Sequence, residues 1–186
     1  MLNDIERVLI SEQEIAEKVK ELGQKITNDY KNEKLLIITI LKGSVVFAAD
    51  LLREIKMPVE IDFMCISSYG NDSKSSGVVK IVKDLNQPIE GVNVLVIEDI
   101  LDSGNTLSHL TELLKTRNPK SIKIATLLDK PDRRVAEVEV TYKGFTIPDE
   151  FVVGYGLDYG EKYRNIPFVG VLKREVYEKE WNLYEI

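Results

Sequence analysis

Two adjacent carboxylates follow an apolar run near the middle of the chain. Glu98 and Asp99 come directly after residues 94–97, which are all aliphatic, as expected of a strand that is buried on both faces. In an open α/β sheet, ligands bind beyond the carboxyl ends of the strands. The sequence therefore predicts that a strand ends at this acid pair and that the pair lies in a ligand site.

The loop after the acid pair has the composition of a phosphate site. It contains Asp102, Ser103, Gly104 and Thr106, and it leads into residues 105–116, where leucines recur at helical spacing. Backbone N–H groups, hydroxyl groups and the start of a helix can together hold a phosphate dianion. Glycine at position 104 lets the backbone approach the anion closely. We therefore expect this loop to bind a phosphate group.

The acid pair needs a different partner, because Glu98 and Asp99 carry the same sign of charge as a phosphate. Ribose hydroxyls suit this role, since a vicinal diol donates two hydrogen bonds and carboxylates accept them. Mg²⁺ shared between the diol and a pyrophosphate would relieve the remaining repulsion. The acid pair and the loop together predict a site for a phosphorylated ribose, with Mg²⁺ as cofactor.

Strands and helices alternate along the first 130 residues, which predicts an α/β fold with a parallel sheet. Helices are expected at 11–30, 44–55 and 105–116, and strands at 35–41, 59–67, 78–82, 92–97 and 122–128. Ser11 and Glu14 have the spacing of a capping box at the start of the first helix. The chain after Lys130 contains only short apolar pieces, at 138–142, 151–153 and 168–172, which we interpret as short strands that complete the site.

The polar, turn-rich residues 69–77 separate two expected strands. A loop of this length without structure of its own is commonly functional. We expect a hairpin whose long mobile loop closes over the site and excludes water.

Length and composition limit the classes of protein to consider. The chain has 186 residues, 44% of them hydrophobic and 30% charged, which predicts one globular domain over 1–186. A net charge of −6 argues against a nucleic-acid partner. The sequence shows neither a long apolar run nor a basic, apolar start, and Cys65 is its only cysteine. We therefore expect a cytoplasmic protein with no membrane partner.

Residues 94–107 resemble the phosphoribosyl pyrophosphate signature of the type I phosphoribosyltransferases. Several further segments resemble the hypoxanthine-guanine branch of that family, and the resemblance covers most of the chain. These segments are Leu41, Lys42 and Gly43; residues 67–70; Lys130; Phe151 and Val152; residues 156–158; and Arg164. The resemblance implies a central parallel sheet flanked by helices, with its core at about 35–130. It also implies a small hood from the termini, at about 1–10 and 145–186, and a mobile hairpin loop.

The family resemblance assigns the matching positions to four parts of the site. Ribose and the 5′-phosphate would be bound by Glu98, Asp99, Asp102, Ser103, Gly104, Asn105 and Thr106. Pyrophosphate would be bound by Leu41, Lys42, Gly43, Ser68, Tyr69 and Arg164. The purine would be bound by Lys130, Phe151, Val152, Leu157 and Asp158. Mg²⁺ would be bound by Glu98, Asp99 and Asp158.

The implied roles agree with the chemistry of the side chains. Phe151 would stack on a flat base, and Lys130 would donate a hydrogen bond to a 6-oxo group, which adenine lacks. Asp102 is the carboxylate beside the phosphate, and the family places a catalytic acid there. Asp102 would therefore accept the proton of the purine N7.

The resemblance implies a purine salvage enzyme that converts phosphoribosyl pyrophosphate and hypoxanthine or guanine to IMP or GMP and pyrophosphate. It also implies a homo-oligomer, either a dimer or a tetramer. Two alternatives remain open at this point. One is a phosphoribosyltransferase that prefers xanthine, and the other is a regulator of the same fold that senses phosphoribosyl pyrophosphate.

Overall fold

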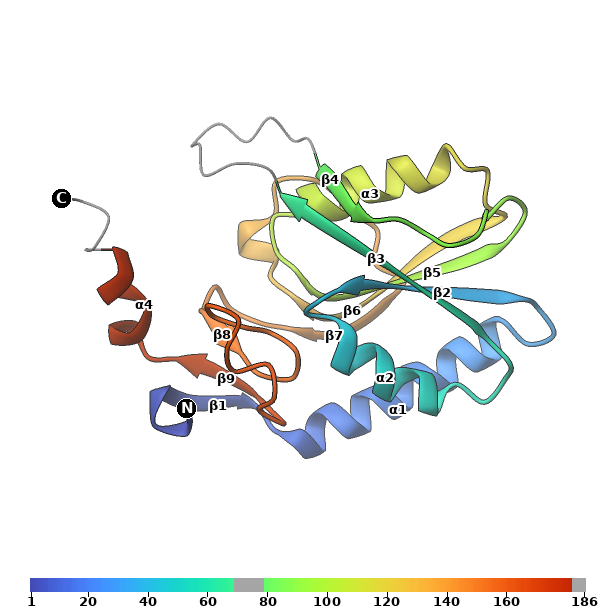
Figure 1. The fold of residues 1–186 in the computed structure, drawn as a ribbon. Helices are drawn as coiled ribbons and strands as arrows, with labels where there is room; N and C mark the ends of the chain where they lie inside the picture. Colours follow the sequence, from blue (N-terminus) through green and yellow to red (C-terminus); the bar gives the residue numbers. More distant parts are fainter. Residues whose placement is uncertain (69–78, 182–186) are drawn as a thin grey trace.

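A six-stranded sheet forms the centre of the molecule, in the order β4-β3-β2-β5-β6-β7 (Figure 1). The computed structural model describes residues 1–68 and 79–181. The strands are β2 (Leu35–Leu41), β3 (Glu60–Ser68), β4 (Val79–Lys83), β5 (Asn93–Leu101), β6 (Ser121–Asp129) and β7 (Tyr142–Thr146). All neighbours pair in parallel except β4, which pairs antiparallel to β3 at the edge. The predicted α/β class with a mainly parallel sheet is confirmed.

Helices cover both faces of this sheet. Helices α1 (Glu12–Asp29) and α2 (Val45–Glu54) pack together on one face, and α3 (Asn105–Lys115) covers the other (Figure 1). Strand β2 shows why the central strands are mostly apolar. Ile37 contributes to the core on the α1 and α2 side, whereas Ile38 contributes to the core on the α3 side. Since side chains alternate along a strand, burial on both faces favours apolar residues at most positions, with Thr39 as the buried polar exception in β2.

The first helix follows its sequence pattern closely. Ser11 Oγ accepts a hydrogen bond from the backbone N–H of Glu14 at 3.3 Å, and the Glu14 carboxylate accepts one from the N–H of Ser11 at 2.8 Å. The predicted capping box is therefore present. The buried side of the helix carries Ile15, Val19, Leu22, Gly23 and Ile26. Their spacing places one apolar stripe against the core.

Strands from near the start of the chain and from its last third form a second, smaller sheet (Figure 1). Strand β1 (Ile5–Ile10) pairs antiparallel with β9 (Val169–Leu172), which pairs antiparallel with β8 (Val152–Val153). A 3₁₀ turn (Leu2–Asp4) precedes β1, and helix α4 (Arg174–Trp181) follows β9. The sequence patterns did not predict α4.

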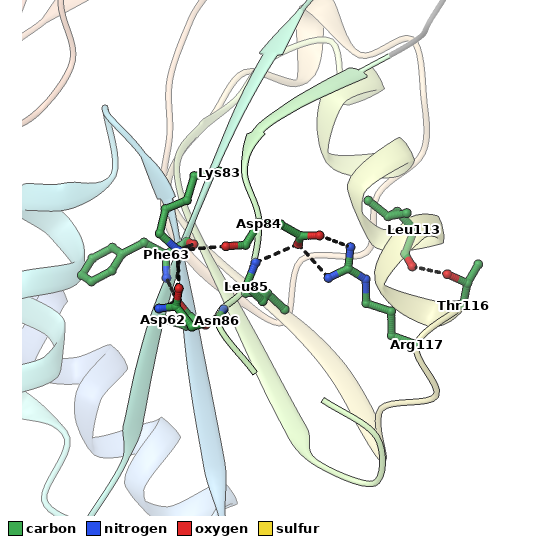
Figure 2. Close-up of polar contacts among 9 residues, drawn as sticks. All are labelled: Asp62, Phe63, Lys83, Asp84, Leu85, Asn86, Leu113, Thr116 and Arg117. Carbon is green, nitrogen blue, oxygen red and sulfur yellow. Dashed lines mark hydrogen bonds and ion pairs between the residues drawn. The ribbon is translucent and has the colours of Figure 1, made fainter. Parts of the chain in front are cut away.

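A polar network fixes the connection between β4 and β5 (Figure 2). The buried Asp62 carboxylate accepts hydrogen bonds from the backbone N–H groups of Phe63 and Asn86, both at 2.7 Å. Lys83 lies 3.4 Å from the same carboxylate and donates to the carbonyl of Phe63 at 2.8 Å. Asp84 and Arg117 form a bidentate ion pair at 2.7 and 2.8 Å, which ties this connection to the segment that follows α3. These bonds anchor the edge of the sheet that β4 forms.

Two strand predictions were wrong at their ends. We expected a strand at 138–142, but β7 begins only at Tyr142, where it joins β6 opposite Ala125. Val138 and Val140 are apolar because they pack against the core near α3, without joining the sheet. We also expected β5 to end before Glu98, but it continues to Leu101.

The hairpin loop expected at 69–77 lies outside the described residues. Among the described residues, none of the helices has both the length and the apolar character that a membrane crossing requires.

Candidate active site

The acid pair lies where β5 extends past its neighbour β2. The last residues that pair between these strands are Thr39 and Ile97, whereas β6 keeps pairing with β5 as far as Leu101. Glu98 and Asp99 therefore lie within a strand, not beyond its end as expected. The continued pairing with β6 holds their backbone rigidly, while the end of β2 leaves space beside them.

A cavity of about 350 Å³ opens at this edge of the sheet. It brings together predicted site residues from four separate segments. They are Leu41, Lys42 and Gly43; Glu98 and Asp99; Asp102, Ser103, Gly104 and Thr106; and Asp158 with Arg164. Ile100 lines the cavity too, although the sequence did not single it out. The predicted phosphate loop, acid pair and pyrophosphate residues thus share one space.

The loop 102–106 has the backbone of an anion site. Gly104, with a φ of 83°, precedes the first residue of α3 and has no side chain that could cap the helix. The N–H of Asn105 donates to Ser103 Oγ at 3.4 Å, and the other N–H groups of the first turn face the loop that an anion would enter. A Cβ at Gly104 would overlap the carbonyl oxygen of Ala136, so the close packing and the left-handed backbone both require glycine.

The surroundings of the acid pair oppose a full negative charge on both carboxyl groups. Burial raises the pKa of Glu98 well above its usual range, and the neighbouring Asp99 carboxylate raises it further. Asp99 Oδ1 accepts a hydrogen bond from the N–H of Ile100 at 2.7 Å. Two carboxylates that cannot easily both be charged favour a ligand that supplies a cation or hydroxyl donors.

Asp102 has an unused acceptor. Its Oδ1 atom is buried and has no hydrogen-bond partner among the described residues. Its Oδ2 atom lies 3.7 Å from Nη1 of Arg133. Because buried polar atoms are nearly always hydrogen-bonded, an unpaired carboxylate oxygen at the edge of a cavity points to a partner on the ligand.

The predicted pyrophosphate cations are already paired with carboxylates. Lys42 Nζ lies 3.1 Å from Oε2 of Glu161, and Arg164 Nη2 lies 3.4 Å from the same oxygen. Arg164 also pairs with Asp158 at 2.9 Å and donates to the carbonyl of Gly156 at 2.8 Å. Glu161 therefore occupies the position between two cations that an anionic ligand would need.

The predicted purine residues lie outside this cavity, apart from Asp158. Lys130 is 7% exposed, and its Nζ atom lies 3.5 Å from Oδ1 of Asp149. Phe151 is 39% exposed and stacks on Tyr177 of α4, with ring centroids 5.0 Å apart and planes at 20°. Val152 and Leu157 are buried.

Asn105, the first residue of α3, also lies outside the cavity. Ser68 ends β3, and Tyr69 falls outside the described residues.

The described residues contain no group of three or more histidine, cysteine, aspartate or glutamate side chains placed to hold a metal ion. The predicted ligands Glu98, Asp99 and Asp158 nevertheless line the same cavity. Mg²⁺ is commonly held by one or two carboxylates together with water and substrate phosphates. The acid pair, whose electrostatics favour a cation, therefore fits Mg²⁺ that arrives with a phosphorylated substrate.

Arginines after Lys130 support the site, and the sequence patterns did not reveal them. Arg134 donates to the carbonyl of Asp102 at 3.1 Å and hydrogen-bonds Oδ1 of Asp129. Arg133 pairs with Asp149 at 2.8 Å. Apart from the Asp129 side chain, their partners are far away in sequence or on the backbone, so no local pattern marked them. The pair of arginines so close to Lys130 was the only available signal.

The fold and the arrangement of the site are those of the phosphoribosyl transferase domain family. The model of the phosphoribosyl transferase domain family matches residues 9–160. The chain is 57% identical over 178 residues to the hypoxanthine-guanine phosphoribosyltransferase of Bacillus subtilis, covering 96% of this chain and 99% of that protein. A crystal structure of a hypoxanthine phosphoribosyltransferase from Staphylococcus aureus superposes with a TM-score of 0.92 at 52% identity, covering 95% of this chain and 96% of the other. The chain therefore belongs to the hypoxanthine-guanine phosphoribosyltransferase family.

Some relatives are longer. The bifunctional protein TilS/HprT of Listeria monocytogenes is 55% identical over 179 residues, which are 96% of this chain and 28% of that protein. The chain thus spans about a quarter of the length of such relatives.

Proposed function

We propose that this protein is a purine salvage enzyme that transfers the 5-phosphoribosyl group from phosphoribosyl pyrophosphate to hypoxanthine or guanine. The products are IMP or GMP and pyrophosphate. The observation that carries the proposal is the unpaired, buried Oδ1 of Asp102, which lies on the phosphate loop of the cavity that contains Glu98 and Asp99. The relatives at 51–57% identity that bear the name hypoxanthine-guanine phosphoribosyltransferase support the same activity.

The sugar phosphate is held at the end of β5. The N–H groups at the start of α3, with Ser103 and Thr106, bind the 5′-phosphate. Glu98 and Asp99 accept hydrogen bonds from the ribose hydroxyls. Loss of pyrophosphate from the anomeric carbon resembles glycoside hydrolysis, in which the sugar develops oxocarbenium character. Holding the ribose at two points aligns this carbon with the base.

The base is recognised along one edge. Phe151 stacks on the ring, Lys130 donates to the 6-oxo group, and the backbone at Val152 and Leu157 contacts the remaining edge. Asp102 accepts the proton of N7 as N9 forms the new bond. A buried ammonium can donate to an oxo group but offers nothing to an amino group, which disfavours adenine.

The leaving pyrophosphate is bound by Lys42 and Arg164, with the backbone at Leu41 and Gly43. Ser68 and Tyr69 complete this part of the site in the proposal. Mg²⁺ held by Glu98, Asp99 and Asp158 would neutralise charge on the diphosphate when bound.

A pyrophosphate-release assay with hypoxanthine, guanine, xanthine, adenine and uracil tests the proposal. Hypoxanthine and guanine should give most of the activity, and EDTA should abolish it. Dominant activity with xanthine would favour the xanthine-preferring alternative. Binding to nucleic acid in a mobility-shift assay, without pyrophosphate release, would favour the regulator.

The oligomeric state is part of the proposal too. A homo-oligomer, either a dimer or a tetramer, and a cytoplasmic location rest on the family resemblance and the composition. Light scattering of the purified protein measures the first directly.

A further inference from the structure

A chain of four charged side chains links the two groups proposed to meet the purine edge. Lys130 Nζ lies 3.5 Å from Oδ1 of Asp149. Arg133 Nε contacts the same oxygen at 2.8 Å, while Arg133 Nη1 reaches Oδ2 of Asp102 at 3.7 Å. Arg133 therefore bridges two carboxylates with two different nitrogens, as the fork of a guanidinium allows.

The local backbone explains why Lys130 and Arg133 share a partner. Lys130 is the N-cap of a 3₁₀ turn (Pro131–Arg133), and the N–H of Arg133 donates to the carbonyl of Lys130 at 3.4 Å. Residues three apart lie on the same side of a 3₁₀ helix, so both side chains point toward Asp149. Asp149 itself comes from the connection between β7 and β8, two residues before Phe151.

The two distances indicate which of the two cations, Lys130 or Arg133, binds the Asp149 carboxylate more tightly. The 2.8 Å contact is a good hydrogen bond, whereas 3.5 Å is a loose ion pair. The hydrogen bond from Arg133 holds the pKa of Asp149 below its usual range. Asp149 thus stays charged and orients the ammonium of Lys130 without occupying it fully, which leaves N–H groups of Lys130 for a 6-oxo group.

We propose that Arg133 and Asp149 are positioning residues for purine recognition. Asp149 aims Lys130 at the 6-oxo group, and Arg133 holds Asp102 beside N7 while keeping its Oδ1 atom free. Since O6 and N7 lie next to each other on a purine, the bridge sets the spacing of their two protein partners. This inference rests on the proposed function.

The test compares Arg133→Gln and Asp149→Asn with wild type. Both positions are well exposed, with 56% and 42% of the side chain accessible, so the fold should survive. Asp149→Asn should raise KM for hypoxanthine and guanine roughly tenfold, and Arg133→Gln should lower kcat by a similar factor, because misplaced polar contacts cost about this much. KM for phosphoribosyl pyrophosphate should change less than twofold in both. The double variant should lose less than the product of the two single effects.

A binding measurement separates positioning of Lys130 from a structural role. Calorimetry compares IMP with purine riboside 5′-monophosphate, which lacks the 6-oxo group, and with ribose 5-phosphate. Wild type should favour IMP, and Asp149→Asn should lose most of that preference while binding ribose 5-phosphate normally. Arg117→Gln is the matched control, because this arginine forms a bidentate pair with Asp84 in the network of Figure 2, at the connection between β4 and β5. It should leave kcat, KM and the IMP preference unchanged.

The outcomes are distinguishable. If wild type releases no pyrophosphate and does not prefer IMP, the proposed function fails. If wild type does both, but the variants keep wild-type kinetics and the wild-type preference for IMP, only the positioning role is overturned. Equal weakening of IMP, purine riboside 5′-monophosphate and ribose 5-phosphate would also overturn it, because that pattern marks general damage to the site.

Discussion

Gly43 lies so close to Asp99 that a Cβ atom at position 43 would overlap Oδ2 of the Asp99 carboxylate. The two residues come from the ends of neighbouring strands, Gly43 just after β2 and Asp99 within β5. Because Gly43 has no side chain, the Asp99 carboxylate can occupy this space. This contact joins the predicted pyrophosphate loop to the acid pair.

Gly43→Ala should impair function more than stability. The clash falls on the far end of a side chain, which can rotate away, so the melting temperature should change little. The displaced Asp99 carboxylate should lower kcat/KM for phosphoribosyl pyrophosphate by roughly 10- to 100-fold. Gly91→Ala is the opposite case, because Gly91 has a φ of 71° with open space around it. It should lower stability by about 1 kcal/mol and leave kinetics intact. A lower melting temperature with unchanged kcat/KM in Gly43→Ala would contradict this account.

Asp62→Asn should reveal an acid-sensitive anchor of the sheet (Figure 2). Burial raises the pKa of Asp62, but hydrogen bonds from Asn86 and Phe63 and the Lys83 ammonium outweigh this, so that its pKa is lowered. A lowered pKa in the folded state gives stability that is complete above the unfolded pKa of about 3.9 and is lost as the pH falls through the folded value.

Denaturant unfolding from pH 7 to pH 3 measures this effect. The Asn variant should be less stable than wild type by about 1–3 kcal/mol at pH 7, because it presents an amide N–H₂ group to donors. The difference should shrink below about pH 4, because Asp62 of the unfolded chain takes up a proton there while the folded carboxylate, with its lowered pKa, still holds its charge. Glu60→Gln, at an exposed position on the same strand, should show no such convergence. A difference that stays constant down to pH 3 would show that the charge of Asp62 is not responsible.

Glu161→Gln should strengthen the binding of pyrophosphate. Hydrogen bonds from Lys42 and then Arg164 lower the pKa of Glu161, so its carboxylate is charged at neutral pH and competes with an anionic ligand for both cations. Removing the charge should lower the inhibition constant of pyrophosphate roughly two- to fivefold, a small effect because the ion pairs are exposed. Glu112→Gln removes a carboxylate paired with Lys115 on α3 and should leave inhibition unchanged. Weaker pyrophosphate binding in Glu161→Gln would mean that Glu161 supports the site.

Local patterns predicted much of the fold. The capping box at Ser11 and the aliphatic runs of β2 and β5 depend only on neighbours in sequence, so the first helix, β2 and the start of β5 were placed correctly. The end of β5 was wrong because it is set by pairing with β6, opposite Leu128 and Asp129. The start of β7 was wrong for the same reason.

In the candidate site too, the features formed by neighbouring residues were predicted from the sequence, and the contacts between distant segments were not. The acid pair and the phosphate loop are contiguous, so composition alone indicated a binding site for a phosphorylated ribose. The contact of Glu161 with Lys42, the stacking of Tyr177 on Phe151 and the bridge through Arg133 all join segments that only the fold brings together. No periodicity or motif carries that information.

Steady-state and binding measurements on Asp102→Asn test the central claim most directly. If Asp102 accepts the N7 proton at the edge of a sugar phosphate cradle, kcat with hypoxanthine should fall by roughly 10²- to 10⁴-fold, since asparagine cannot take up a proton. The dissociation constant of phosphoribosyl pyrophosphate with Mg²⁺, from calorimetry, should stay within about twofold, because the loop backbone and the acid pair are untouched. A variant that keeps wild-type kcat would contradict the account.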